Sequence, residues 1–282
     1  MSKIKKHFYN IETKKINKTK IVLLSDIHYY NKEDYFKLEM IYNSLKEIKP
    51  DYITIAGDLL DNAYISDTNV IYSWLKDISL LATVIISIGN HDLLVKEDFE
   101  AGFDKKLFDK IDALDNVYVL NNKSLLIDNI NFLGITLPAS YYYETHEPKD
   151  YLINYINNVF PKIDKDNYNI LLCHSPLRIC NKEVLNSINI KNNLDLILCG
   201  HTHGGITPEF LKPILKNIGL ISPFRRLFFK NAYGKLKIDN TNIIISSGIT
   251  KASHRNRFHV LDNFFAREIT IIEISNNITQ GK

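Results

Sequence analysis

Short runs of apolar residues alternate along this chain with stretches in which apolar side chains recur at helical spacing. Residues 21–25, 52–56 and 84–88 are continuous runs rich in isoleucine, valine and leucine, which is typical of strands that are covered on both faces. Residues 33–48 and 70–78 lie between these runs and repeat apolar side chains every three or four positions, as amphipathic helices do. The order strand, helix, strand, helix, strand predicts a parallel sheet with right-handed crossovers.

The rest of the chain continues in the same manner. The pattern predicts further helices at residues 103–114, 150–159 and 183–188. It predicts further strands at residues 117–120, 125–127, 131–135, 170–173, 194–199, 243–246 and 269–274, with a turn at Asp128-Asn129. No repeat, low-complexity block or linker interrupts the pattern. We therefore expect one domain over residues 1–282, with its core at 20–275, built from two stacked sheets with outer helices.

Composition and charge narrow the class of protein only slightly. With 282 residues, of which 45% are hydrophobic, the chain is long enough to bury a large core. A net charge of +3 is too small to indicate nucleic-acid binding by itself. The first twenty residues are basic but lack the apolar segment of a signal peptide, and no run reaches the roughly 20 apolar residues of a membrane span. We therefore expect a soluble, cytoplasmic protein.

The three cysteines, Cys173, Cys180 and Cys199, are odd in number. Cys173 and Cys199 lie inside strand-like apolar runs, where a free thiol behaves as a small hydrophobic side chain. The chain is therefore expected to keep reduced cysteines and to have no disulfide framework. A catalytic cysteine is the alternative, and we favour it less.

Metal-ligand side chains stand at the ends of five apolar runs. They occur in the stretches Asp26-Ile27-His28, Gly57-Asp58, Gly89-Asn90-His91-Asp92, Cys173-His174 and Gly200-His201-Thr202-His203. Each stretch taken alone is more typical of a turn, a loop or a core histidine. All five in this order are not expected of a core, and ligands of open α/β sheets collect outside the carboxyl ends of strands. The sequence therefore predicts that these side chains meet at one edge of a sheet.

The donor atoms favour metal ions that accept both oxygen and nitrogen ligands. If the chain stays extended, Asp26 and His28, two residues apart, point to the same side and reach one cation. Asp58 is the natural bridge, because a carboxylate has lone pairs for two metals, and Asn90 adds a neutral amide oxygen. The imidazole donors are His174, His201 and His203. A set without thiolates suits Mn, Fe or Zn better than it suits a structural zinc site.

These motifs, in this order, resemble the motif set of the calcineurin-like metallophosphoesterases, over roughly residues 20–275. The resemblance implies a four-layer αββα sandwich, in which two stacked mixed β-sheets are flanked by helices, and a dinuclear metal site. It implies that one metal is held by Asp26, His28, Asp58 and His203. It implies that the other metal is held by Asp58, Asn90, His174 and His201. It also implies that His91 is the acid beside the leaving group and that Asp92 orients it.

The reaction expected from this resemblance is hydrolysis of a phosphodiester or pyrophosphate bond. Two divalent cations about 3.5–4 Å apart lower the pKa of a shared water and clamp the phosphoryl oxygens, while the resulting hydroxide attacks in line. His91 then protonates the departing oxygen, a step typically worth about 10²–10⁴-fold in rate. Mn is the favoured metal, although Mn, Fe and Zn share these ligands.

Two other functions stay open at this point. A nuclease for single-stranded nucleic acid would use the same metals beside a basic groove lined with aromatic side chains, and the sixteen tyrosines leave room for one. A non-catalytic scaffold would keep the fold without turnover. Loss of a bridging aspartate or of an imidazole would favour the scaffold, but no motif position is lost here.

Within the family, the stretch Gly-His-Thr-His-Gly-Gly followed by a proline and an apolar segment resembles a bacterial branch of membrane-associated phosphodiesterases. That branch includes enzymes of the UDP-diacylglucosamine hydrolase type. The chain departs from it at Ile206, where the branch commonly has glutamine. It departs again at Phe265-Ala266-Arg267-Glu268, where the branch commonly has Pro-Pro-Glu.

Residues 208–230 form an apolar segment with interleaved lysines and arginines, and it begins five residues after His203. Pro213 and Pro223 break this segment, so we expect short helical pieces. One interpretation is a lid that packs on the domain. The other is a basic amphipathic surface that docks on an anionic membrane, at its inner face, or accepts an acyl chain.

Arg255 and Arg257 are candidates to hold a substrate phosphate through bidentate contacts, with a solvated loop as the alternative. Asp61, three residues after Asp58, is either a helix cap or a hydrogen-bond partner for a ligand imidazole.

Overall fold

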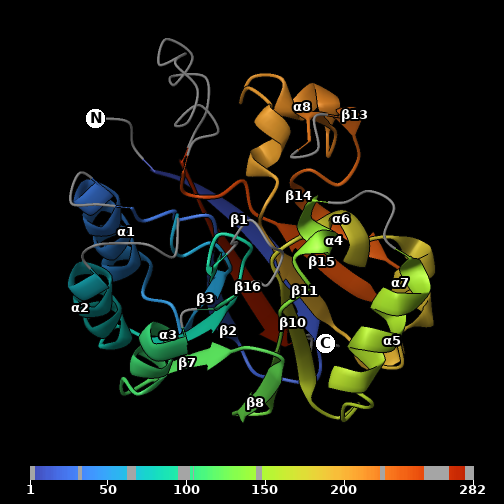
Figure 1. Cartoon of the computed structure of the whole chain (residues 1–282), viewed down its shortest axis with the longest axis horizontal. Helices are drawn as coiled ribbons and strands as arrows, with labels where there is room; N and C mark the ends of the chain where they lie inside the picture. Colours follow the sequence, from blue (N-terminus) through green and yellow to red (C-terminus); the bar gives the residue numbers. More distant parts are fainter. Residues whose placement is uncertain are drawn as a thin grey trace, which may run out of the picture.

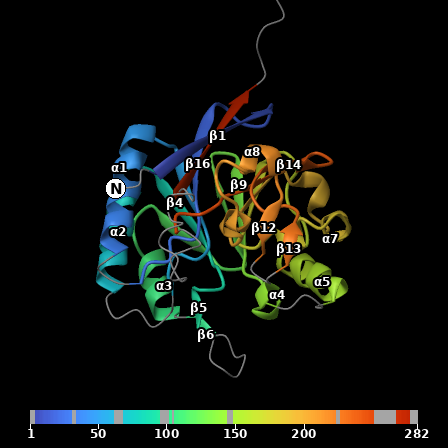
Figure 2. The same ribbon diagram turned by 90° about the horizontal axis from the view of Figure 1, so that it is seen from above.

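Two six-stranded sheets lie face to face at the centre of the computed structural model, and helices cover the outer face of each sheet (Figure 1 and Figure 2). The structure describes residues 4–30, 34–61, 68–94, 102–103, 105–143, 148–222, 226–250 and 267–276. The strands are β1 (Ile4–Thr13), β2 (Thr19–Leu24), β3 (Tyr52–Ala56), β4 (Thr83–Ser87), β5 (Leu93–Leu94), β6 (Gly102–Phe103), β7 (Val117–Leu120), β8 (Lys123–Ile127), β9 (Ile130–Ile135), β10 (Tyr168–Cys173), β11 (Leu196–Cys199), β12 (Gly219–Ile221), β13 (Leu227–Phe229), β14 (Gly234–Ile238), β15 (Thr241–Ile245) and β16 (Arg267–Asn276). The helices are α1 (Tyr35–Ile48), α2 (Thr68–Ser79), α3 (Lys105–Asp112), α4 (Ser140–Tyr143), α5 (Lys149–Val159), α6 (Pro176–Ile179), α7 (Lys182–Ser187), α8 (Lys212–Leu215) and the 3-10 helices η2 (Lys191–Asn193) and η3 (His203–Ile206).

Sheet one has the strand order β1-β16-β2-β3-β4-β7. Strands β2, β3, β4 and β7 run parallel to one another, whereas β16 pairs antiparallel with β2 and parallel with β1. Helices α1, α2 and α3 connect the parallel strands and lie together on the outer side of this sheet (Figure 1). The predicted parallel sheet with crossover helices is therefore confirmed.

Sheet two has the order β14-β15-β11-β10-β9-β8. Its four central strands are parallel, and β14 and β8 are antiparallel edge strands. The β8–β9 turn has left-handed backbone at both Asp128 (φ 48°) and Asn129 (φ 66°). Two such residues in a row are typical of the tight turn whose twist matches a hairpin, so the turn predicted at this dipeptide is confirmed.

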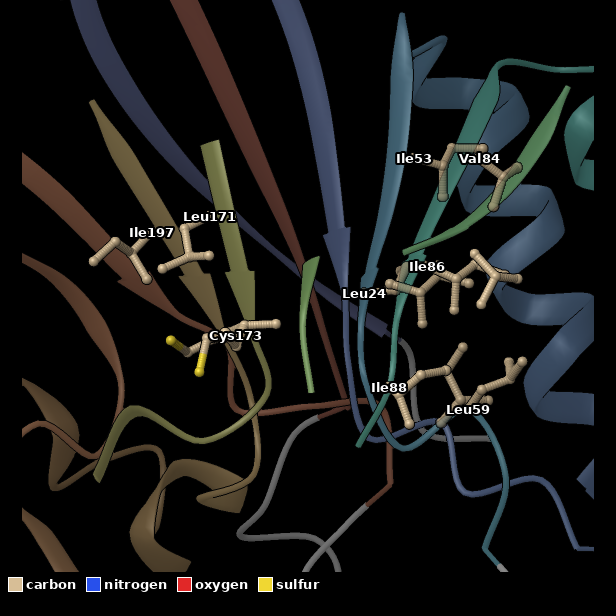
Figure 3. Close-up of a cluster of buried hydrophobic side chains, with 14 of the residues drawn as sticks. Leu24, Ile53, Leu59, Val84, Ile86, Ile88, Leu171, Cys173 and Ile197 are labelled. Carbon is tan, nitrogen blue, oxygen red and sulfur yellow. The ribbon is translucent and has the colours of Figure 1, made fainter. Parts of the chain in front are cut away.

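Alternate side chains of the central strands enter two different parts of the core. One set, which includes Leu23, Ile85 and Leu172, fills the space between the two sheets. The other set packs under the helices, and Figure 3 shows its members Leu24 and Ile86 on sheet one and Leu171 on sheet two. Every central strand is thus covered on both faces, which explains why these strands appear in the sequence as continuous apolar runs.

The resulting layers, helices, sheet, sheet and helices, are the predicted α/β four-layer αββα sandwich. Two strands of the six-stranded sheets, β1 and β14, were not predicted. Both are edge strands whose side chains are largely exposed or half-buried. They can therefore carry lysines and other polar residues, which hides the apolar signal on which the prediction depended.

The segment after the Gly-His-Thr-His motif differs from the expected series of helical pieces. Among the described residues of this segment only α8 is helical, and β12 and β13 then form a small antiparallel pair. In the described ranges, no helix combines the length and the apolar character that a bilayer crossing requires. All three cysteines are free and buried, as expected, and burial raises the pKa of the Cys173 and Cys199 thiols.

Candidate metal centre

The loops that carry the candidate ligands follow strands of both sheets and are bound to one another through the backbone. The Asp26 amide donates to the Gly57 carbonyl at 3.2 Å. The His28 amide donates to the Asp58 carbonyl at 3.0 Å. The Thr250 amide donates to the Asp26 carbonyl at 2.9 Å. The loop after β15 in sheet two is therefore fixed to the loop after β2 in sheet one, and the carboxyl ends of strands from both sheets meet at one edge.

Five of the candidate ligands have left-handed backbone. The angle φ is 51° at Asp26, 46° at His28, 52° at Asp58, 70° at His201 and 47° at His203. Residues other than glycine rarely adopt this region; it costs about 1–3 kcal/mol, and such residues cluster at functional sites. The expectation that an extended backbone aligns Asp26 with His28 is therefore wrong, because sharp left-handed bends bring the two side chains together instead.

Asp26, His28 and His203 form one group of side chains that could hold a metal ion. His28 Nε2 lies 3.9 Å from Asp26 Oδ1, and His203 Nε2 lies 3.6 Å from the same oxygen. The two imidazole rings are stacked, with centroids 5.2 Å apart. Asp26 is fully buried, and its Oδ2 accepts the backbone amide of His201 at 3.0 Å. This carboxylate therefore links the group to the loop after β11.

Asp58, His174 and His201 form a second such group. His174 Nε2 lies 3.0 Å from Asp58 Oδ2, and the rings of His174 and His201 meet at 70° with centroids 5.0 Å apart. The same oxygen, Asp58 Oδ2, lies 3.6 Å from His28 Nε2 in the first group. Asp58 is thus the side chain between the two groups, the position that a bridging carboxylate requires.

Two motif glycines allow the backbone to approach the carboxylates closely. A Cβ atom at Gly89 would lie 2.2 Å from Asp58 Oδ1, and a Cβ atom at Gly200 would lie 2.5 Å from Asp26 Oδ2. Both distances are far below van der Waals contact, so neither position accepts a side chain without moving a candidate ligand. Asn90, which follows Gly89, is buried in the same turn.

The imidazoles present lone pairs to the cluster. His174 Nδ1 lies 2.7 Å from the Ala56 carbonyl oxygen, and His203 Nδ1 lies 3.2 Å from that of Thr250. A carbonyl oxygen only accepts, so each Nδ1 carries a proton and the neutral ring has its lone pair on Nε2. The Nε2 atom of His174 faces Asp58 Oδ2, and the buried Nε2 atom of His201 finds no hydrogen-bond partner within the described part of the chain. Imidazole nitrogens with available lone pairs, next to two carboxylates, are ligands for divalent cations. These residues therefore fit a site for such cations.

The pKa values of the side chains in the cluster also favour bound cations. Burial alone would lower the pKa of His174, but the adjacent Asp58 carboxylate outweighs it and raises the pKa to about 9. Burial would raise the pKa of Asp58, yet His174 holds it well below its usual value. Burial and the charge of His174 lower the pKa of His201 to about 3. The two buried carboxylates thus attract positive charge, whether as a proton or as a cation.

His91 lies beside both groups, and its side chain is 23% exposed. Its backbone amide donates to Asp58 Oδ1 at 2.8 Å, and its Nδ1 lies 2.7 Å from the Asp61 carbonyl oxygen. Its ring meets that of His28 edge-on, with centroids 4.6 Å apart. The contact with a carbonyl places a proton on Nδ1, so Nε2 is the His91 atom that can exchange a proton with a substrate.

Asp92 contacts the backbone around the cluster. Its carboxylate accepts the amides of Asp58 and Leu60, both at 2.9 Å, and that of Gly89 at 2.8 Å. Burial, followed by the charge of Asp58, raises the pKa of Asp92 to about 7. These three bonds hold the loop after β3 against the turn after β4, which is a different task from the orientation of His91 that we expected.

Asp61 makes the contacts that orient the neighbouring imidazoles. Its Oδ1 lies 3.0 Å from His28 Nδ1 and 3.7 Å from His91 Nδ1. Its backbone carbonyl is also the partner of His91 Nδ1. Of the two interpretations of Asp61 from the sequence, the partner of a ligand imidazole is therefore the one that agrees with the structure.

The structure thus brings the predicted metal ligands to one edge of the sheets. They are Asp26, His28, Asp58, Asn90, His174, His201 and His203. Arg255 and Arg257 lie outside the described residues, so their role as phosphate ligands stays a prediction.

A buried lysine behind the cluster was not predicted. The side chain of Lys37 is 1% exposed, and its Nζ donates to the carbonyls of Ile27 and His28, both at 3.0 Å. The same nitrogen lies 2.8 Å from Asp34 Oδ1. Lys37 occupies the apolar stripe of α1, four residues before Ile41. A lysine within such a stripe is the signal that could have identified it.

Replacing Lys37 with methionine should lower the free energy of unfolding by about 3 kcal/mol, because Asp34 and two carbonyls would lose a buried partner. Lys46→Met in the same helix removes an exposed lysine and should change stability by less than about 0.5 kcal/mol. Urea denaturation of both variants measures the difference. Equal midpoints would show that the Lys37 contacts do not stabilise the fold.

The model of a known protein family matches most of the chain. Residues 19–205 match the family model for calcineurin-like phosphoesterases. A Caenorhabditis elegans protein that is provisionally named a metallophosphoesterase is 26% identical over 231 residues, which cover 81% of this chain and 44% of that protein. An uncharacterised metallophosphoesterase of Helicobacter pylori (strain J99 / ATCC 700824) is 25% identical over 189 residues, which cover 66% of this chain and 45% of that protein. The chain thus spans less than half the length of these two relatives.

Solved structures with a related arrangement have low sequence identity to this chain. The purple acid phosphatase PPD1 from yellow lupin (Lupinus luteus) seeds is 12% identical, with a TM-score of 0.46 over 92% of this chain and 54% of that chain. GAP50, the anchor in the inner membrane complex of Plasmodium, is also 12% identical, with a TM-score of 0.41 over 83% of this chain and 72% of that chain.

Proposed function

The chain belongs to the calcineurin-like phosphoesterase family, whose members are metal-dependent phosphoric ester hydrolases, and we propose that it hydrolyses phosphodiester or pyrophosphate bonds with two divalent cations. In this proposal one cation is held by Asp26, His28, Asp58 and His203. The other is held by Asp58, Asn90, His174 and His201. Three groups of described side chains could hold a metal ion, including His28, Asp61 and His91. The observation that carries the proposal is that one oxygen of Asp58 lies between the other two groups.

The cations and the residues around them contribute to this reaction in different ways. Two bound cations supply charge neutralisation for the phosphoryl oxygens and a lower pKa for water. The contacts of His174 Nδ1 and His203 Nδ1 with carbonyl oxygens leave the Nε2 atom of each ring directed at the cluster. Asp92 holds the Asp58 loop in place through three backbone amides. A phosphate group bound at this edge would therefore meet donors and charges that are already arranged.

His91 is the residue that we propose to protonate the leaving oxygen. The Asp61 carbonyl fixes its Nδ1 proton, so the proton that passes to the substrate leaves from Nε2. The contact of its backbone amide with Asp58 Oδ1 keeps the ring beside both cation groups. Arg255 and Arg257, which lie outside the described residues, are proposed to bind the phosphate.

The finer identity of the enzyme is also proposed. We infer that manganese is its preferred metal and that residues 1–282 act as one domain. A membrane-associated substrate, as in the bacterial phosphodiesterase branch with enzymes of the UDP-diacylglucosamine hydrolase type, is supported by the apolar and basic segment that follows the Gly-His-Thr-His motif. On this hypothesis the protein acts in the cytoplasm, peripheral to the inner face of the membrane.

Protein stripped of metal by a chelator should lose activity on a bis-aryl phosphodiester. It should regain that activity as two equivalents of Mn²⁺ are added, because each group of ligands takes one ion. Isothermal titration and turnover, measured on the same samples, give the stoichiometry and the rate. A parallel panel of an aryl monoester, a UDP-sugar lipid and single-stranded DNA identifies the substrate class. Full activity of the stripped protein, or a single Mn²⁺ that restores it completely, would contradict the dinuclear proposal.

A further inference from the structure

An unusual number of apolar side chains are exposed on the segment that follows η3. Thirteen large hydrophobic residues are exposed in the part of the chain that the structure describes, and five of them come from this short segment. They are Phe210 (62% exposed), Ile214 (73%), Ile221 (37%), Leu227 (67%) and Phe228 (64%). The segment therefore does not pack on the domain as a simple lid, and this concentration of exposed apolar surface marks an interaction site.

Positive charge surrounds these apolar side chains. Lys216, Arg226 and Lys230 are exposed on the same segment. Its single acidic residue, Glu209, already contacts Lys212 and also Lys5, the latter at 2.6 Å. The segment thus exposes apolar and cationic side chains together, which is the composition of a surface that binds anionic lipid.

This surface is held firmly next to the metal centre. The backbone of Gly219 in β12 and the ring of Phe229 in β13 pack against Gly205 so closely that a Cβ atom there would lie 2.3 Å and 3.0 Å from them, respectively. Gly205 belongs to η3, two residues after His203. Helix α8, β12 and β13 lie together in both views of the molecule (Figure 1 and Figure 2). Lys212 Nζ also contacts Ser247 Oγ at 3.0 Å, which ties the segment to the loop after β15.

We propose that α8 and the β12–β13 pair form a docking surface for an anionic lipid bilayer, with Ile214, Leu227 and Phe228 entering the interface. The use of this surface, to bring the metal centre to phosphodiesters of membrane lipids, rests on the proposed function. A second copy of the chain is a poorer occupant, because a two-fold interface would place Lys216, Arg226 and Lys230 against the same cations of the partner.

The test is flotation of the full chain with two kinds of vesicle, phosphatidylcholine mixed with phosphatidylglycerol and phosphatidylcholine alone, at low and high salt. The wild type should float with the mixed vesicles at low salt and much less at high salt, because salt screens surface charge. The double variant Leu227→Ser/Phe228→Ser should bind about a hundredfold more weakly, since each buried apolar side chain contributes about tenfold. Lys216→Gln/Lys230→Gln should weaken binding by roughly tenfold or more, from about fivefold for each cation near the surface.

Leu80→Ser/Leu126→Ser is the matched control, because it removes two exposed apolar residues, 80% and 57% exposed, from other parts of the surface. It should float like the wild type. All variants should hydrolyse a soluble bis-aryl phosphodiester at the wild-type rate. A wild type that hydrolyses this substrate but does not float would overturn the docking inference alone. A wild type that floats but does not hydrolyse it would overturn the proposed function alone.

Two further outcomes would also overturn the inference. One is equal loss of flotation in the Leu80/Leu126 control, which would indicate non-specific hydrophobic adsorption. The other is a dimer, measured by light scattering, that dissociates on Leu227→Ser/Phe228→Ser while neither form floats. In that case the apolar face would be an interface between two copies of the chain.

Discussion

Replacing Asp58 with asparagine should lower turnover of a phosphodiester by at least about 10³-fold, because one buried oxygen would no longer carry the charge that two cations share. Asp58 Oδ2 lies 3.6 Å from His28 Nε2 and 3.0 Å from His174 Nε2, so both groups lose the same partner at once. Asparagine keeps the size of the side chain and can still accept the His91 amide, which donates to Asp58 Oδ1 at 2.8 Å. The fold should therefore survive.

The measurement is metal content by mass spectrometry together with turnover under saturating Mn²⁺. Asp58→Asn should retain fewer than two ions per chain. Asp77→Asn, a change of the same kind at an exposed position on α2, should behave as the wild type does. Two tightly bound ions and undiminished turnover in Asp58→Asn would show that this carboxylate does not join the two groups.

The second large effect is expected at His91, where replacement by asparagine should slow hydrolysis by about 10²–10⁴-fold for substrates with poor leaving groups. The leaving alkoxide of such a substrate needs a proton as its bond to phosphorus breaks. His91 Nε2 is the atom placed to supply it, since the Asp61 carbonyl occupies Nδ1. Metal content should stay at the wild-type level, because the proposal assigns His91 as a ligand to neither cation.

A series of aryl and alkyl diesters with leaving groups of increasing pKa tests this role. The rates of wild type and His91→Asn should converge as the leaving group improves, because a nitrophenolate departs without a proton. A constant ratio along the series would indicate that His91 positions the substrate rather than protonating it. Equal rates with the poorest leaving group would remove His91 from the reaction.

The fold could be predicted because most of its central strands are covered on both faces. Strand β3 is buried at every position, and so appears in the sequence as an uninterrupted apolar run. Strand β1 could not be predicted by the same reasoning. It lies at the edge of sheet one, and its sequence breaks any regular alternation, with Lys5, Lys6 and His7 in succession. Pairing with β16, 263 residues away between Ile4 and Arg267, makes it a strand, and no local pattern reports such a partner.

The identity of the clustered side chains could also be predicted, but not the geometry that brings them together. The motifs follow strands that are neighbours in the sheets. Which strands are neighbours depends on the topology, and the order of elements along the sequence predicts that topology. The left-handed bends at Asp26 and His28, by contrast, depend on backbone bonds to loops far along the chain. For the same reason, the contacts of Asp61 and Asp92 could not be predicted from the sequence. The structure shows that the Asp92 carboxylate accepts the backbone amides of Leu60 and Gly89.

The position of β16 between β1 and β2 has a consequence for how the protein is made. On the ribosome, β1 and β2 are synthesised before β16, and their facing edges stay unpaired until β16 has been made. Unpaired strand edges of this kind can pair with other nascent chains. Contacts between residues so far apart in the sequence also form slowly. Protein lacking residues 267–276 should therefore accumulate as aggregates rather than as a loosened enzyme. The metal-bearing edge would form only after translation has reached the last strand of sheet one.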